Sequence, residues 1–209
     1  LFKTLRASEG EHCLLMDGRG TIGEAEVAPG RMLLLKSKEC AVSRPLPRIH
    51  LYIAPPRRQK MDQILKQVTE LGVSRIVPMI CERSVSLPDE DSVGGRWTEL
   101  MFEACKQSGN RFVPETTPAL RFREAVADAQ ARCSVSFYGS VAECGHPEHH
   151  PDAITDLAWF IGPEGGFSDA EENGMRDASF QALHFGHWVL RVETAAVCGI
   201  AILMDRFRS

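Results

Sequence analysis

Residues 158–171 read Ala-Trp-Phe-Ile-Gly-Pro-Glu-Gly-Gly-Phe-Ser-Asp-Ala-Glu and place a strand, a glycine-rich turn and a helix start in direct succession. The apolar run 158–161 is typical of a strand that a parallel sheet buries on both faces. Ser168 and Glu171 have capping-box spacing, which predicts that a helix begins there. The glycines between them either let a ligand approach the backbone closely or simply form a tight turn.

A second glycine turn lies in residues 185–196, Phe-Gly-His-Trp-Val-Leu-Arg-Val-Glu-Thr-Ala-Ala. Arg191 and Glu193 stand where a strand gives way to an apolar helix, and the helix dipole favours a glutamate in the first turn. The pair reads either as part of a ligand site or as a surface arginine beside a helix cap. The earlier turn is neither a Walker loop nor a dinucleotide-binding loop, because it lacks both Gly-Lys-Ser/Thr and GxGxxG.

Strands and amphipathic helices alternate along the chain around these turns. Apolar residues at helical spacing in 60–71 form one face, and Gly72 follows as a helix end. Such alternation implies an α/β fold with a mainly parallel sheet. We expect strands at residues 49–54, 76–80, 135–138, 158–161 and 182–185, and helices at 60–71, 96–107, 120–130 and 193–207.

The first 44 residues have a different pattern of short strands and tight turns. Turn signals at Asp17-Gly18 and Pro29-Gly30 separate the apolar runs 13–16, 25–27 and 32–35. This pattern predicts a small β-barrel or part of one. The proline-punctuated stretch 43–47 follows as a linker. We therefore expect two domains, residues 1–47 and 48–209.

Charge is distributed unevenly along a chain whose formal net charge is −4. Lys and Arg outnumber Asp and Glu by 8 to 6 in residues 1–48 and by 12 to 11 in 49–140, but only 4 face 11 in 141–209. Phosphate contacts, if the chain makes them, should therefore come from the first two thirds. Ordinary charge variation would also explain the difference. A hydrophobic content of 44% predicts a packed core.

The seven cysteines are odd in number and form no CxxC pair, which favours reduced thiols in a cytoplasmic protein over a disulfide framework. No apolar run approaches the roughly 18 residues of a membrane-spanning helix, and we expect no signal peptide and no membrane partner. Cys144, His146, His149 and His150 lie close together, but their spacing matches no zinc pattern, so we predict a polar loop and no metal.

The two glycine turns together resemble the hallmarks of the RsmE family of SPOUT-class methyltransferases. Residues 162–168 match its GPEGGFS-like loop. Its terminal Leu-Gly-x-Arg-x-Leu-Arg-x-Glu-Thr-Ala segment is matched by Gly186, Leu190, Arg191, Glu193, Thr194 and Ala195. Family-like stretches continue upstream at 66–73, 83–84, 103–108 and 111–114. The resemblance covers about residues 49–207, and weakly 1–27.

The chain departs from the family pattern in two respects. Trp188 stands where the family usually has the first arginine of the terminal segment, and His187 precedes it. This change affects the wall of the expected cofactor pocket. Family members also usually carry further residues before the segment that matches Leu1, so the barrel is expected to be incomplete.

The resemblance implies a C-terminal SPOUT-type parallel sheet with a trefoil knot, preceded by a small PUA-like β-barrel. It also implies a cytoplasmic homodimer that uses S-adenosylmethionine to methylate N3 of a uridine in 16S ribosomal RNA of the small subunit. Two alternatives remain open. One is methylation at another RNA position such as a ribose 2′-hydroxyl, and the other is a non-catalytic RNA-binding or ribosome-assembly module.

The expected site residues follow from the matched motifs. Arg191 should stabilise charge that develops on the uracil oxygens, with Glu193 either orienting it or acting as base. Glu164 is an alternative for the same supporting role. The expected cofactor-binding residues are Gly139, Ile161, Gly162, Glu164, Gly165, Gly166, Gly186, Val189, Leu190, Thr194 and Ala195. For RNA the best candidate phosphate contacts are Arg57, Arg58, Lys60, Arg83 and Arg111, although for each residue taken singly a solvated surface charge is the favoured interpretation.

Overall fold

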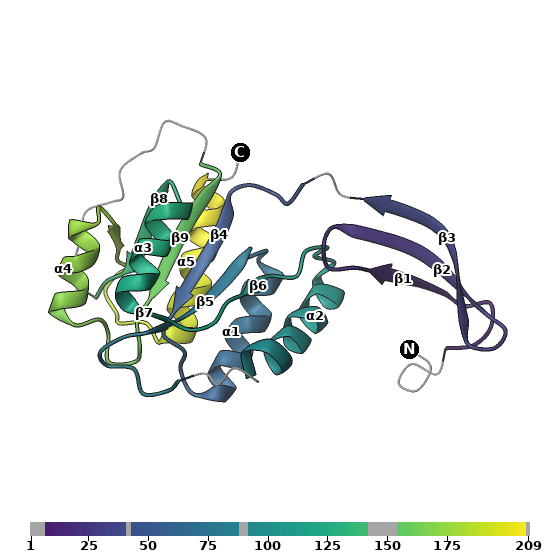
Figure 1. The fold of residues 1–209 in the computed structure, drawn as a ribbon, viewed down its shortest axis with the longest axis horizontal. Helices are drawn as coiled ribbons and strands as arrows, with labels where there is room; N and C mark the ends of the chain where they lie inside the picture. Colours follow the sequence, from purple (N-terminus) through teal and green to yellow (C-terminus); the bar gives the residue numbers. More distant parts are fainter. Residues whose placement is uncertain (1–6, 41–42, 88–91, 142–153, 208–209) are drawn as a thin grey trace. The chain divides into compact units, whose positions relative to one another are not determined.

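The computed structural model describes residues 7–40, 43–87, 92–141 and 154–207. The chain divides into two compact units (Figure 1). The first combines Leu1–Arg44 with the short segment Arg111–Val113, and the second combines Pro45–Asn110 with Pro114–Ser209. The segment 111–113 thus belongs with the first unit although it lies in the middle of the second along the chain.

The first unit contains an antiparallel sheet of three strands in chain order, β1 (His12–Met16), β2 (Thr21–Ala28) and β3 (Met32–Cys40). The turn between β1 and β2 forms because the carboxylate of Asp17 accepts hydrogen bonds from the N–H groups of Arg19 and Thr21 at 2.7 and 3.0 Å. The segment 111–113 is attached to this turn, since Val113 N–H donates to the carbonyl of Gly18 at 2.8 Å.

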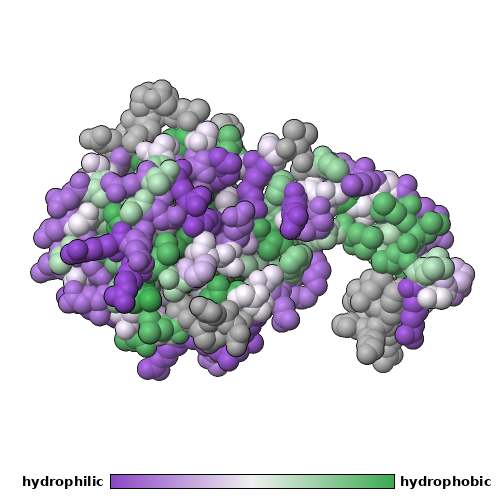
Figure 2. Space-filling model, in the orientation of Figure 1, coloured by the Kyte–Doolittle hydropathy of each residue, from purple (hydrophilic) through white to green (hydrophobic). Residues whose placement is uncertain are grey.

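Apolar side chains gather on the surface over the strands of this unit, as Figure 2 shows. Leu14, Met32, Leu34 and Leu35 are all more than half exposed. A small sheet that leaves such a face open buries little apolar area, so most of the core lies in the second unit.

The second unit is built on a parallel sheet with the strand order β10-β8-β9-β4-β5-β6, and β7 also pairs with β5. This confirms the α/β fold with a parallel sheet. The strands are β4 (Arg48–Ile53), β5 (Arg75–Ile80), β6 (Glu115–Thr116), β7 (Leu120–Arg121), β8 (Val135–Gly139), β9 (Asp156–Ile161) and β10 (Gln181–Leu183).

Helices cover both faces of this sheet (Figure 1). They are α1 (Arg58–Glu70), α2 (Trp97–Ser108), α3 (Phe122–Arg132), α4 (Asp169–Asp177) and α5 (Val192–Phe207). Alternate strand residues face opposite layers. In β9, Phe160 stacks on Tyr52 within the core beneath α3, whereas Trp159 faces Gly199 of α5. Both residues are fully buried, which explains the continuous apolar run in this strand.

The structure differs from the predicted helix at 120–130. Leu120 and Arg121 instead form β7 beside Met79 and Ile80 of β5, and α3 begins at Phe122. A single π turn, Ser92–Arg96, also precedes α2. The capping box that the sequence predicts for α4 is confirmed, with Ser168 N–H donating to Oε2 of Glu171 at 2.9 Å. Among the described residues, no helix is long and apolar enough to cross a membrane.

Candidate functional site

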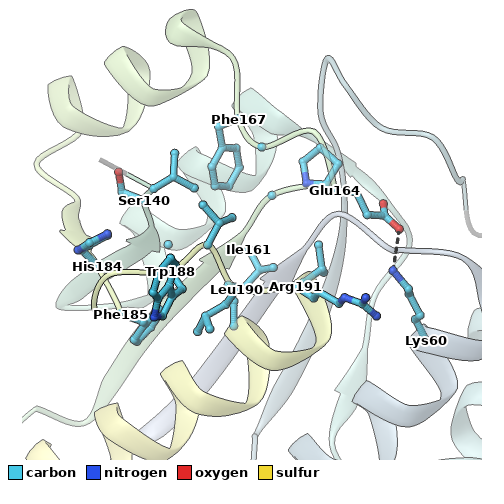
Figure 3. A pocket seen from close by; sticks show the side chains of 18 residues that line it. Lys60, Ser140, Ile161, Glu164, Phe167, His184, Phe185, Trp188, Leu190 and Arg191 are labelled. Atoms are coloured by element: carbon cyan, nitrogen blue, oxygen red, sulfur yellow. Dashed lines mark ion pairs between the residues drawn. The ribbon is translucent and has the colours of Figure 1, made fainter. Parts of the chain in front are cut away.

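A cavity of about 330 Å³ opens where three neighbouring parallel strands, β8, β9 and β10, reach their carboxyl ends (Figure 3). In open α/β sheets this edge is where ligands bind. The wall comes from the end of β8, the loop after β9 and the segment between β10 and α5. The lining residues are Lys60, Gly139, Ser140, Val141, Ile161, Gly162, Pro163, Glu164, Gly166, Phe167, His184, Phe185, Trp188, Val189, Leu190, Arg191, Val192 and Ala195.

The loop after β9 needs glycine at two of its positions. Gly166 has a φ of +71°, which L side chains rarely adopt, and its N–H donates to the carbonyl of Pro163 at 2.8 Å. A Cβ on Gly162 would lie 3.2 Å from both the backbone nitrogen and the ring of Phe167. The loop after β9 is therefore a tight turn and a part of the cavity wall at the same time. A structural turn and a ligand-binding loop are thus not mutually exclusive interpretations of its glycines.

A segment after β5 holds this loop in place. Nη1 of Arg83 donates to the carbonyls of Gly165 and Phe167 at 3.0 and 3.2 Å. Glu82 N–H donates to Oε1 of Glu171 at 2.9 Å, while the other carboxylate oxygen of Glu171 caps α4. The loop is thus fixed from outside the cavity, and its inner face is left for a ligand.

One end of the cavity carries charged side chains. Nζ of Lys60 lies 3.6 Å from Oε1 of Glu164 and 3.7 Å from Oε2 of Glu193. Figure 3 shows Arg191 extending toward this end. Its guanidinium makes no hydrogen bond or ion pair to any residue in the described part of the chain. Oε2 of Glu193 is buried and accepts no hydrogen bond there either.

The other end of the cavity is apolar and aromatic. Phe185 packs edge-on against the buried Trp159, with 5.6 Å between ring centroids. Trp188 and Val189 line the cavity while 83% and 77% of their surface stays exposed. The cavity therefore suits a ligand that is flat and apolar at one end and charged at the other.

Eight of the predicted cofactor-binding residues line the cavity, and the predicted Arg191 lines it too. The eight are Gly139, Ile161, Gly162, Glu164, Gly166, Val189, Leu190 and Ala195. Gly165, Gly186 and Thr194 are not among the lining residues. Gly165 lies against Arg83, and Gly186 has a φ of +82° within the segment before α5. Glu193 lies behind the wall, next to Lys60.

The predicted RNA-binding residues are not gathered in one place. Arg57 and Arg58 are exposed at the start of α1, whereas Lys60 lines the cavity. The guanidinium of Arg83 donates hydrogen bonds to carbonyls of the loop after β9. Arg111 belongs to the first unit, where it forms two hydrogen bonds to the carboxylate of Glu39 at 2.9 and 3.3 Å.

Sequence reasoning missed several lining residues, which are Ser140, Val141, Pro163, Phe167, His184, Phe185 and Val192. Ser140 directly follows the end of β8, so the rule that ligands bind at strand carboxyl ends would have found it. The described residues contain no group of three His, Cys, Asp or Glu side chains that would hold a metal ion. Cys144, His146, His149 and His150 lie outside the described residues.

Comparison with known proteins identifies relatives of this chain. A family model described as RNA methyltransferase domain matches residues 43–204. Ribosomal RNA small subunit methyltransferase E of Synechocystis is 26% identical over 96% of this chain and 68% of the relative. The protein of the same name from Aquifex aeolicus is 32% identical over 69% of this chain and 62% of the relative. The chain thus spans about two thirds of the length of these relatives.

Solved structures show the same fold. The crystal structure of a ribosomal RNA small subunit methyltransferase E from Neisseria gonorrhoeae, bound to S-adenosyl methionine, superposes with a TM-score of 0.85. It is 29% identical in sequence, and the match covers 98% of this chain and 86% of that one. A methyltransferase from Legionella pneumophila in complex with the same cofactor gives a TM-score of 0.85 at 27% identity, covering 98% and 86% of the two chains.

Proposed function

Because the chain belongs to the RNA methyltransferase domain family, and to its RsmE members, we propose that it uses S-adenosylmethionine to methylate N3 of a uridine in 16S ribosomal RNA. The observation that carries this proposal is the cavity at the carboxyl ends of β8, β9 and β10. It combines a glycine-lined wall, an aromatic end and, at the charged end, the guanidinium of Arg191 without a protein partner among the described residues.

The cavity fits the proposed cofactor. Gly139 and Ile161 line the same wall, where a Cβ on Gly139 would make ordinary contacts with Ile161 at 3.4 Å and with Trp159 at 3.5 Å. The apolar end suits an adenine ring, and the charged end suits a sulfonium with an amino-acid group. We propose that the predicted cofactor-binding residues hold S-adenosylmethionine mainly through their backbone groups. These groups lie at the end of β8, in the loop after β9 and in the segment between β10 and α5.

When bound, S-adenosylmethionine supplies a methyl group whose bond to sulfur breaks with both electrons left on sulfur. The protein's part is to orient the two reactants and to stabilise charge on the acceptor. N3 of uridine becomes a good nucleophile only once its proton has left, and the uracil then carries negative charge. Arg191 is positioned to donate to that charge, because its guanidinium lines the cavity with its donors unused. Glu193 lies two residues further along the chain, at the start of α5, and with Lys60 it supports this end of the cavity.

Three further features are part of the proposal. A trefoil knot is proposed from the resemblance to the RsmE family, in which the segment after the edge strand β10 would thread before α5 returns to β4 and β9 in the middle of the sheet. A PUA-like barrel that binds RNA is supported by the antiparallel sheet of the first unit. A homodimer is supported by exposed apolar side chains near the cavity and on α5, namely Val141, Val189 and Ile202. A cytoplasmic location is proposed with it, because that is where the proposed ribosomal substrate would be met.

The proposal is tested by methyl transfer in vitro. The purified protein is incubated with labelled S-adenosylmethionine and small ribosomal subunits from a strain that lacks the endogenous activity, and the digested RNA is analysed by mass spectrometry. We expect label in 3-methyluridine. Arg191→Ala should abolish this label. Arg123→Ala should preserve it, because Arg123 is an exposed arginine of α3 that does not line the cavity.

Other outcomes would point to the alternatives. Label in a 2′-O-methylated nucleoside would retain the cofactor but overturn the N3 assignment. No transfer, together with no cofactor binding by calorimetry, would overturn the enzymatic function and favour an RNA-binding module.

A further inference from the structure

Lys60 differs from the other basic residues at the start of α1 because it lines the cavity. Its Nζ lies between the carboxylates of Glu164 and Glu193 at 3.6 and 3.7 Å. Both distances exceed those of a hydrogen bond. The ammonium makes no hydrogen bond to any residue that the structure describes. Its charge is therefore balanced by two neighbours, while its N–H donors stay available toward the cavity.

The two carboxylates hold the ammonium from two different segments. Glu164 belongs to the loop after β9, and Glu193 to the first turn of α5. The Glu193 side chain is only 15% exposed, so its charge is poorly solvated and needs a nearby cation. This arrangement fixes the Lys60 side chain at the end of the cavity toward which Arg191 also extends (Figure 3).

The proposed acceptor has the matching chemistry, and this step rests on the proposed function. In uracil, N3 stands between two carbonyl groups. When the N3–H bond breaks, the proton leaves to solvent and the electron pair stays on the ring, so one negative charge is shared by N3, O2 and O4. The methyl group then bonds to N3. Stabilising the intermediate anion from both sides therefore takes one donor at each carbonyl oxygen.

We propose that Lys60 is a second catalytic cation, which donates to one carbonyl oxygen of the target uracil while Arg191 donates to the other. Two cations lower the proton affinity of N3 more than one does, because each favours the charged form of the base. The base recognised in this way is one that carries an acidic ring N–H between two carbonyl groups, which describes uracil and excludes cytosine.

The test compares wild type with Lys60→Met and Lys60→Arg in methyl transfer to small ribosomal subunits, with the rate followed from pH 6.5 to 8.5. We expect Lys60→Met to lower kcat at neutral pH by on the order of 100-fold with little change in KM. Its rate should also continue to rise with pH after the wild-type rate has levelled off, with the midpoint displaced upward by about 1 to 2 pH units. Lys60→Arg should recover most of the rate, because it keeps the charge. Lys66→Met removes a lysine of α1 that is exposed and does not line the cavity, and it should behave as wild type.

Two results would overturn the proposal. An equal loss at every pH, accompanied by weaker S-adenosylmethionine binding in calorimetry, would mean that Lys60 only positions Glu164 and Glu193. A normal kcat with weaker, salt-sensitive RNA binding would mean that Lys60 contacts a phosphate. Failure of the proposed function is distinguishable from both, because the wild-type protein would then transfer no methyl group to uridine.

Discussion

Gly199 determines how closely α5 packs on the sheet, and Gly199→Ala should destabilise the protein. An added Cβ would lie 2.3 Å from Cε2 and Cζ2 of Trp159 and 2.6 Å from its Nε1, whereas ordinary contacts begin near 3.4 Å. Trp159 has no room to retreat, because it is fully buried and its ring packs against Phe185. The ring or the helix must therefore move by about 1 Å, which is overpacking of a dense core.

The magnitude follows from two opposing effects. Overpacking typically costs about 1–3 kcal/mol, while replacing glycine by alanine inside a helix contributes about 1 kcal/mol of stabilisation. We expect a net loss of up to about 2 kcal/mol in the free energy of unfolding. Trp159 belongs to β9, and its ring contacts Phe185, which lines the cavity. A shift of Trp159 should therefore also weaken S-adenosylmethionine binding.

The measurement is urea unfolding at equilibrium, with Gly174→Ala as a matched control. Gly174 is also helical, in α4, but its Cβ would meet only Cε1 of Phe122 at 3.8 Å, an ordinary contact. That variant should therefore gain roughly 0.5–1 kcal/mol. If Gly199→Ala were as stable as Gly174→Ala, the close packing of α5 on Trp159 would be refuted.

Three further predictions concern the N-cap of α4, the stability of the protein at acid pH and the side chain of Arg191. Ser168→Ala removes the acceptor of the Glu171 N–H at the start of α4 and should cost about 1 kcal/mol in the same urea assay, where an unchanged midpoint would contradict the cap. Burial raises the pKa of Asp128, but hydrogen bonds from Arg75, Tyr52 and Arg132 outweigh it and lower the pKa to about 2. This pKa lies below that of the same carboxyl in the unfolded chain, so the ionised Asp128 stabilises the folded protein by about 2 kcal/mol. The stabilisation is fully present above about pH 4 and is lost as the pH falls toward 2. Asp128→Asn should flatten that part of the Tm profile, and an unaltered profile would contradict the assignment. Arg191→Lys should retain part of the activity that Arg191→Ala loses, because a lysine keeps the charge without the planar fork, and equal loss in both would show that the fork itself is required.

Most helices and strands were predictable because local patterns determine them. The helical spacing of Met61, Ile64 and Leu65 and the capping box at Ser168 are legible in a few residues of sequence. The two-residue strands β6 and β7 were missed, since so short a strand has no periodicity and exists only through pairing with β5. The attachment of 111–113 to the first unit was missed for a similar reason, because it depends on hydrogen bonds to residues 18 and 20.

The candidate site was predictable only in part. Its glycine loops and Arg191 are visible as motifs at a strand-to-helix transition. The lining by His184, Phe185 and Trp188 depends on β10 lying beside β8, and no local pattern specifies that strand order. Lys60 was predicted as a phosphate contact because of its basic neighbours at the start of α1. Its place between Glu164 and Glu193 is a tertiary contact between segments far apart in the chain.

The central claim is that this chain methylates N3 of a uridine in small-subunit ribosomal RNA, and complementation in cells tests it most directly. The chain would be expressed in a bacterial strain that lacks the endogenous activity, and its 16S RNA would be digested and analysed by mass spectrometry. We predict that 3-methyluridine is restored by the wild-type chain and not by Arg191→Ala expressed at the same level. Folded and abundant wild-type protein with no 3-methyluridine in the 16S RNA would contradict the claim.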